Sequence, residues 1–146
     1  MGKRIAIASD HAGYNMKQAI IAHLKEKGYV VEDFGTDSDR AVDYPDYGHP
    51  LAGAVESGAY KAGISLCGSG NGISMVTNKY RGIRSAICWN REIAILARNH
   101  NDANICSLPA RFLNTKEAEE IVDAFLESGF DGGRHERRIK KIPLQK

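Results

Sequence analysis

Short apolar runs alternate along the chain with longer segments in which apolar residues recur at helical spacing. The run 3–9 is β-branched and alanine-rich, which is typical of a buried strand. In the segment 14–27, apolar residues recur every three or four positions, and Gly28 is a natural C-terminal stop for a helix. The other predicted strands cover 29–34, 63–67, 83–88 and 103–108, and the other predicted helices cover 51–57, 73–80, 90–99 and 115–126.

This alternation of strands and helices predicts a parallel sheet covered on both faces. We therefore expect a single α/β domain over 1–146: a three-layer α/β/α sandwich with a doubly wound, five-stranded parallel sheet of Rossmann-like type. The polar segment 36–50 is expected to be a long loop, and a basic tail follows from about residue 130. Ligands of such sheets bind outside the carboxyl ends of the strands. The loops after Ser9, Phe34, Cys67, Cys88 and Leu108 are therefore the first candidates for a site.

Composition and charge narrow the possible classes of protein. Charged residues make up 26% of the chain and hydrophobic residues 42%, which excludes a disordered or fibrous protein. The net charge is +2, but segment 134–146 holds six basic residues and one acidic residue, so that 14 basic and 17 acidic residues remain elsewhere. An anionic ligand is therefore expected to meet the tail. No apolar run approaches the length of a membrane span, and we expect a cytoplasmic protein without membrane partners.

The most informative segment is Cys67-Gly-Ser-Gly-Asn-Gly72, between a predicted strand and a predicted helix. Its alternate glycines allow backbone N–H groups to converge on an anion, although a flexible turn is the other interpretation. The spacing matches neither a dinucleotide fingerprint nor a P-loop, which predicts no nucleotide cofactor. Cys67 adjoins this loop, where a helix N-terminus favours the thiolate. Cys88 and Cys106 end apolar strands without such a loop and are interpreted as buried hydrophobes; the three cysteines contain no CxxC spacing and predict no metal site.

Two histidines and the basic tail are further candidates for functional residues. His11 follows the first predicted strand and His100 precedes the fifth, although either residue alone is more often an ordinary loop histidine. If the tail is helical, Arg134 and Arg138 share one face and can grip a phosphate with two planar forks. A solvated charged end and a nucleic-acid arm are the alternatives. The acidic body and the few aromatic residues near the tail argue against nucleic acid.

Taken together, the motifs resemble those of the family of B-type ribose-5-phosphate isomerases, which also holds galactose-6-phosphate isomerase subunits. The matching pieces occur in family order over nearly the whole chain. They are Asp10-His-Ala-Gly13, Asp43-Tyr-Pro-Asp46, Cys67-Gly-Ser-Gly-Asn-Gly72, Asn78-Lys79, Gly82-Ile-Arg84, His100-Asn-Asp102, Arg111 and Gly132-Gly-Arg-His135 with Arg138.

The resemblance implies a role for each matching residue. Cys67 is the expected base that moves a proton between C1 and C2, and His100 is the expected acid that opens the furanose ring. The loop 68–72 is expected to hold the enediolate oxygen through its N–H groups. The expected substrate-binding residues are Asp10, His11, Tyr44, Gly68, Ser69, Gly70, Asn71, Gly72, Asn101, Arg111, Arg134 and Arg138, with the arginines on the phosphate. Family members are homodimers or homotetramers whose sites include residues of a neighbouring subunit.

One departure bears on the identity of the base. Ser-Gly-Asn-Gly resembles a second branch of the family, in which a Glu follows the last glycine and serves as the base. Here Ile73 occupies that position, so the role falls to Cys67. The expected activity is the interconversion of ribose 5-phosphate and ribulose 5-phosphate in the non-oxidative pentose phosphate pathway, with neither metal nor cofactor. The alternatives are a hexose 6-phosphate isomerase acting on galactose or allose 6-phosphate, and a non-catalytic phosphosugar-binding module.

Overall fold

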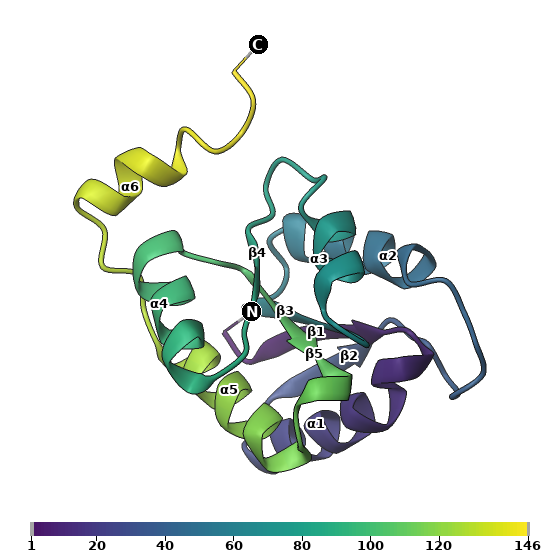
Figure 1. The fold of residues 1–146 in the computed structure, drawn as a ribbon. Coiled ribbons are helices and arrows are strands. Elements are labelled where there is room, and N and C mark those ends of the chain that lie inside the picture. The colour runs from purple at the N-terminus through teal and green to yellow at the C-terminus, as the bar shows by residue number, and fades with distance from the viewer. Residues whose placement is uncertain (1, 146) are drawn as a thin grey trace.

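A five-stranded parallel sheet forms the centre of the protein. The computed structural model describes residues 2–145, and its strands lie in the order β2-β1-β3-β5-β4 (Figure 1). Their bounds are β1 (Arg4–Ser9), β2 (Val30–Asp33), β3 (Ala62–Cys67), β4 (Ser85–Ile87) and β5 (Ile105–Pro109). The predicted α/β architecture with five parallel strands is therefore confirmed.

Helices cover both faces of this sheet. They are α1 (Tyr14–Glu26), α2 (Pro45–Glu56), α3 (Asn71–Thr77), α4 (Arg91–Asn101), α5 (Thr115–Glu127) and α6 (Arg134–Ile139), with two short 3₁₀ helices, η1 (His11–Gly13) and η2 (Ala110–Phe112). Helices α1, α4 and α5 pack on one face, and α2 and α3 pack on the other. Helix α6 contacts α4 and projects from the body with the C-terminal tail (Figure 1).

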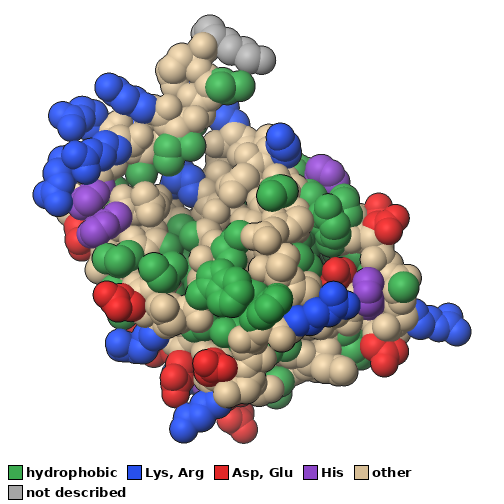
Figure 2. All heavy atoms as spheres, in the orientation of Figure 1, with side chains coloured by type: hydrophobic (Ala, Val, Ile, Leu, Met, Phe, Trp, Pro, Cys, Tyr) green, Lys and Arg blue, Asp and Glu red, His purple; other side chains and the backbone are tan. Residues whose placement is uncertain are grey.

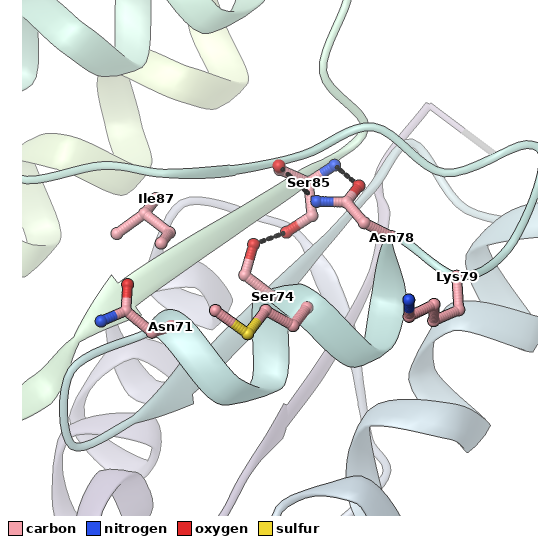
Figure 3. A pocket seen from close by; sticks show the side chains of 7 residues that line it. Asn71, Ser74, Asn78, Lys79, Ser85 and Ile87 are labelled. Carbon is pink, nitrogen blue, oxygen red and sulfur yellow. Dashed lines mark hydrogen bonds between the residues drawn. The ribbon is translucent and has the colours of Figure 1, made fainter. Parts of the chain in front are cut away.

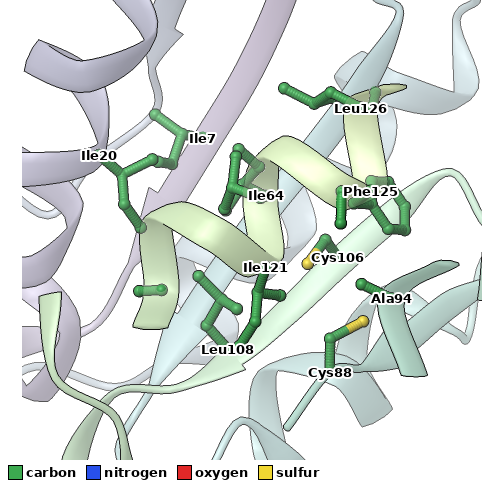
Figure 4. Close-up of a cluster of buried hydrophobic side chains, with 14 of the residues drawn as sticks. Ile7, Ile20, Ile64, Cys88, Ala94, Cys106, Leu108, Ile121, Phe125 and Leu126 are labelled. Carbon is green, nitrogen blue, oxygen red and sulfur yellow. The ribbon is translucent and has the colours of Figure 1, made fainter. Parts of the chain in front are cut away.

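The larger part of the hydrophobic core lies between the sheet and the helices α1, α4 and α5 (Figure 4). Ile7 of β1 lies beside Ile20 of α1, Ile64 of β3 lies beside α5 with its residues Ile121 and Phe125, and all five side chains are buried. On the opposite face the strands carry small residues such as Ala6 and Ala8, and these pack with Leu51 and Val55 of α2. Both faces of β1 are thus buried, which explains its nearly continuous apolar sequence.

Helix α2 differs from the prediction. It begins at Pro45, and the expected start near residue 51 was wrong. The two prolines suggested a loop, yet Pro45 occupies the first turn of the helix, where a backbone N–H has no helical partner. Pro50 lies within the helix and removes one backbone hydrogen bond. The loop before α2 is consequently shorter than expected and ends at Tyr44, the N-cap residue of the helix.

The tail forms the short helix that would place Arg134 and Arg138 one turn apart. None of the helices within residues 2–145 combines the length and the apolar character that crossing a bilayer requires.

Candidate active site

A cavity of about 390 Å³ opens where β3 ends, at Cys67. The carboxyl ends of β1 and β5 flank β3 at the same edge of the sheet, because Ser9 is in register with Leu66, and Cys67 with Pro109. This is the edge at which parallel α/β sheets bind ligands. Eight residues line the cavity: Asp10, Tyr44, Cys67, Gly68, Ser69, Gly72, Arg111 and Phe112. The cavity therefore brings together seven of the predicted site residues, and the eighth lining residue is Phe112.

Sequence reasoning did not single out Phe112. It lies in η2, in the loop after β5 that the strand-end rule had nominated, but its apolar side chain carried no chemical signal. Its exposed ring lies against that of Trp89, with 5.4 Å between the ring centroids. Phe112 therefore lines the cavity with a ring that packs against Trp89.

The glycine loop has little room for side chains. Gly70 has a φ of +77° and caps α3, and a Cβ atom there would lie 3.2 Å from the backbone of β5. The buried hydroxyl of Ser107 in β5 donates a hydrogen bond to the Gly70 carbonyl at 2.9 Å. A Cβ atom at Gly72 would lie 2.6 Å from the ring of Tyr44. The loop is thus held between β5 and an aromatic ring: Gly70 needs the conformational freedom of glycine, and a side chain at Gly72 would displace the ring of Tyr44.

Arg111 reaches the cavity from η2. Its backbone N–H donates to the Gly68 carbonyl at 3.0 Å, and its guanidinium lies beside the Cα atom of Gly68. A planar cation is therefore placed next to Cys67, at the start of the glycine loop. Such a group favours an anionic ligand or a developing oxyanion in the cavity.

Asp10 and His11 are fixed by hydrogen bonds at the end of β1. The Oδ1 atom of Asp10 accepts from the backbone N–H groups of Ala12 and Gly13, at 2.9 and 3.2 Å, and so caps η1. The Nδ1 atom of His11 accepts a hydrogen bond from the backbone N–H of Val42 at 3.1 Å. Because Nδ1 is the acceptor, the ring proton is on Nε2, which leaves one N–H donor for a ligand.

His100 and Asn101 lie elsewhere, at the C-terminal end of α4. The ring of His100 stacks on that of His135 in α6, with centroids 4.3 Å apart and an angle of 9° between the planes. Burial in this stack, followed by the charges of His100, Arg134 and Arg138, lowers the pKa of His135. The stack links α6 to α4. His100, the predicted ring-opening acid, and Arg134 and Arg138, the predicted phosphate-binding residues, therefore form a second group of predicted site residues, separate from those that line the Cys67 cavity.

The two groups occupy opposite edges of the sheet. Arg84, which precedes β4, donates a hydrogen bond to the Asn101 carbonyl at 2.9 Å, so the end of α4 lies at the amino edge. Ile105, at the start of β5, is in register with Gly63, four residues before Cys67. Four residues of a strand span about 13 Å. The cavity at Cys67 is accordingly lined by none of His100, Asn101, Arg134 and Arg138.

A larger open pocket of about 580 Å³ lies between α3 and β4 (Figure 3). Three of its polar residues are engaged in hydrogen bonds: Asn78 bonds to the backbone N–H and carbonyl of Ser85, and the hydroxyls of Ser74 and Ser85 are 2.9 Å apart. These contacts give Asn78, one of the family-like motif residues, a structural role in the turn before β4. The Cys67 cavity is the better candidate for chemistry because its polar groups face an open space.

Cys88 and Cys106 are fully buried, in agreement with their interpretation as hydrophobes (Figure 4). A hydrogen bond with Cys88, together with burial, raises the pKa of the Cys106 thiol well above its ordinary value, so this thiol stays protonated at neutral pH. Cys67 differs from both because it lines a cavity. Among residues 2–145, no cluster of three or more His, Cys, Asp or Glu side chains is arranged to hold a metal ion.

Comparison with known proteins agrees with this geometry. The family described as Ribose/Galactose Isomerase matches residues 5–142. The chain is 43% identical over 140 residues to ribose-5-phosphate isomerase B of Escherichia coli, covering 96% of this chain and 94% of that protein. The crystal structure of a Thermotoga maritima ribose 5-phosphate isomerase superimposes with a TM-score of 0.94 at 51% identity, covering 96% of this chain and 97% of the other.

A third relative was solved with a ligand. The Mycoplasma genitalium ribose-5-phosphate isomerase B, with bound ribulose-5-phosphate, has a TM-score of 0.91 and 42% identity to this protein, covering 95% of this chain and 93% of the other. The family match, the sequence identities and the structural superpositions thus agree over nearly the full length of the chain. The chain belongs to the ribose/galactose isomerase family.

Proposed function

We propose that this protein is an aldose–ketose isomerase that interconverts ribose 5-phosphate and ribulose 5-phosphate by proton transfer through an enediolate. The observation that carries the proposal is the cavity in which Cys67, the glycine loop and Arg111 meet. Its family membership and the ribulose-5-phosphate bound to the Mycoplasma genitalium relative support the choice of a pentose phosphate. The three free thiols suit a reducing compartment, in keeping with a cytoplasmic metabolic enzyme.

The chemistry requires a base above C1–C2, and Cys67 is that base. It takes the proton from one carbon and returns it to the other, while the N–H groups of residues 68–72 stabilise the enediolate oxygen. Ile73, which occupies the position of the alternative base, is fully buried and carries no titratable group. The proton transfer therefore rests on Cys67.

His100 opens the sugar ring, and Arg134 and Arg138 hold the phosphate. These groups cannot reach the Cys67 cavity of their own chain, because they lie at the opposite edge of the sheet. We therefore propose a homo-oligomer, a dimer or a tetramer of dimeric units, in which the α4–α6 group of one chain completes the cavity of its neighbour. The projection of α6 from the body supports this arrangement (Figure 1).

An exposed apolar surface supports the same arrangement. Hydrophobic side chains gather near the centre of the face shown in Figure 2. Exposed apolar residues of α3, α4, η2 and the segment after β4 are Met75, Trp89, Ile93, Leu96 and Phe112. Apolar side chains of this size next to a polar cavity are typical of an interface.

Mixing of two impaired variants, assayed at a substrate concentration well below KM, tests the shared site. Cys67→Ala removes the base, and Arg138→Ala removes a charge-assisted phosphate contact worth about ten- to a hundredfold in affinity. After dissociation and reassembly of equal amounts, half of random dimers are mixed, and each mixed dimer has one intact site. The expected activity on ribose 5-phosphate is about a quarter of that of the wild type.

No recovery of activity, with mixed oligomers demonstrated by mass spectrometry, would refute the shared site. The two parent variants, reassembled separately, are the controls. Turnover of the wild type on ribose 5-phosphate, galactose 6-phosphate and allose 6-phosphate tests the substrate, and faster turnover of a hexose phosphate would refute the pentose assignment.

A further inference from the structure

Lys17 is a fully buried lysine on α1 to which the proposed chemistry gives no role. Its ammonium group donates three hydrogen bonds. Two go to the carboxylate oxygens of Asp33, both at 2.7 Å, and the third goes to the backbone carbonyl of Thr36 at 2.8 Å. Each ammonium proton thus has its own acceptor, and the charge is balanced by a carboxylate.

Stability alone is a poor explanation for this buried ion pair. Removing a lysine ammonium from water costs about as much free energy as a well-formed ion pair returns, and well-packed apolar residues of similar volume often stabilise a fold equally well. A buried charge with three directed hydrogen bonds does, however, define the position of the groups that it binds more strictly than an apolar contact. The question is therefore which part of the molecule Lys17 positions.

The Lys17 contacts lie where the chain leaves β2 and runs beside the end of β1. Asp33 also accepts a hydrogen bond from the N–H of Gly35 at 2.9 Å. Ser9 donates to the Gly35 carbonyl and accepts from the N–H of Thr36, both at 2.8 Å. The ammonium group therefore ties α1 to the segment that pairs with the last residue of β1, directly before Asp10.

Residues 36–44 follow this point in the chain, and their first connection to the candidate site is a hydrogen bond to His11. Val42 lies in this segment, and its N–H donates to Nδ1 of His11. This hydrogen bond selects the ring tautomer with its proton on Nε2. If the segment moves, the donor moves away from Nδ1, and the imidazole is free to take either tautomer.

A second connection between this segment and the candidate site is made by the first turn of α2. The ring of Tyr47 packs against Gly35, where a Cβ atom would lie 2.6 Å from the ring. Tyr44 caps the same helix, and its ring packs against Gly72 in the glycine loop. The place of Gly35 therefore influences how Tyr44 enters the Cys67 cavity.

We propose that Lys17 is a positioning residue for the candidate active site: its buried ammonium group fixes the exit of β2, so that residues 36–44 hold His11 as the Nε2–H tautomer and bring Tyr44 onto Gly72. The kinetic consequences rest on the proposed isomerase function. The tautomer of His11 is a property of the protein without substrate and is measured independently.

The test compares Lys17→Met with Lys27→Met in the full-length protein. Methionine keeps the length of the lysine stem and removes the charge. Lys27 is the matched control because it is the C-cap residue of the same helix and pairs with a carboxylate, that of Asp123 in α5, at 2.9 Å. Imidazole ¹⁵N spectra report the tautomer, and a His11→Gln variant identifies the signals of His11.

The wild type and Lys27→Met are expected to show His11 as the Nε2–H tautomer, whereas Lys17→Met is expected to show a mixture. With ribose 5-phosphate, kcat/KM of Lys17→Met is expected to fall by as much as about a hundredfold, the loss that a displacement near 1 Å produces. Most of this change is expected in KM, because Lys17 makes no hydrogen bond to Cys67 or to the glycine loop.

A folded Lys17→Met protein that keeps the tautomer and the kinetic constants of Lys27→Met would overturn the proposal. If Lys17→Met does not fold, the double variant Lys17→Met, Asp33→Asn leaves no unpaired buried charge, and the same spectra and kinetics decide the question. If the wild type does not isomerise ribose 5-phosphate, the proposed function fails, and the ¹⁵N spectra still decide whether Lys17 positions His11.

Discussion

The contact between Tyr44 and Gly72 can be tested by adding one methyl group. In Gly72→Ala the new Cβ atom would lie 2.6 Å from the nearest atom of the Tyr44 ring, whereas ordinary contacts begin at 3.4 Å. The ring must therefore retreat by about 0.8 Å. Tyr44 is 39% exposed, so the ring has room to move outward and the fold need not open.

The expected change in stability follows from two opposing effects. Alanine in place of glycine within a helix is stabilising by up to about 1 kcal/mol. Overpacking against a ring costs about 1–3 kcal/mol. Gly72→Ala is therefore expected to lose up to about 2 kcal/mol of unfolding free energy. Because Tyr44 lines the cavity, kcat/KM for ribose 5-phosphate is expected to fall by up to about a hundredfold.

Gly53→Ala is the matched control. Gly53 lies within α2, and a Cβ atom there would have no neighbour within 4 Å. This variant is expected to gain about 0.5–1 kcal/mol and to keep wild-type kinetics. Urea unfolding and isomerase assays on both variants measure the difference. If Gly72→Ala behaved like Gly53→Ala in both measurements, the ring of Tyr44 would have no fixed place on the loop, and the reasoning would be refuted.

Two further predictions concern titratable groups. Burial and the charges of the neighbouring histidine and arginines lower the pKa of His135 below its ordinary value of 6.5, so an undocked α6 binds a proton more readily than the docked helix. The docking of α6 on α4 is therefore expected to weaken as the pH falls through 6.5, measured by hydrogen exchange of the α6 amides, and His135→Asn should remove this dependence. Iodoacetamide at neutral pH is expected to alkylate Cys67 and to spare Cys88 and Cys106, and peptide mapping of the labelled protein checks this. The Cys67→Ala variant should lose both labelling and isomerisation, whereas Cys88→Ala should retain both.

Much of the fold was predictable because the strands are short apolar runs and the longer helices are amphipathic. The start of α2 was not, because Pro45 and Pro50 suggested a loop, and a proline at the first helical position is distinguished only by its backbone geometry. The order of the strands was not predictable either, because β4 pairs with β5 on the outside of the sheet and no local pattern records that choice.

Lys17 shows a second limit of sequence reasoning. A lysine next to apolar residues of a helix is normally placed at the surface, with its charge in water. Its partner Asp33 is 16 residues away and becomes a neighbour only when β2 pairs with β1. Cys67 and the glycine loop, in contrast, could be predicted to act together because they are adjacent in sequence. Contacts within one motif can be predicted from the sequence, whereas contacts that form only when strands pair cannot.

The division of the candidate site follows from the order of elements along the chain. In a parallel sheet with crossover helices, a residue directly after a strand lies at the carboxyl edge, and a residue directly before a strand lies at the amino edge. Cys67 ends β3, and His100 comes shortly before β5, so one chain places them apart whatever its side chains do. A base from one edge and a ring-opening acid from the other can meet only between two molecules. If both groups serve one substrate, oligomerisation is therefore a requirement of the chemistry, and in the proposed oligomer the projecting α6 would carry Arg134 and Arg138 to the Cys67 cavity of the neighbour.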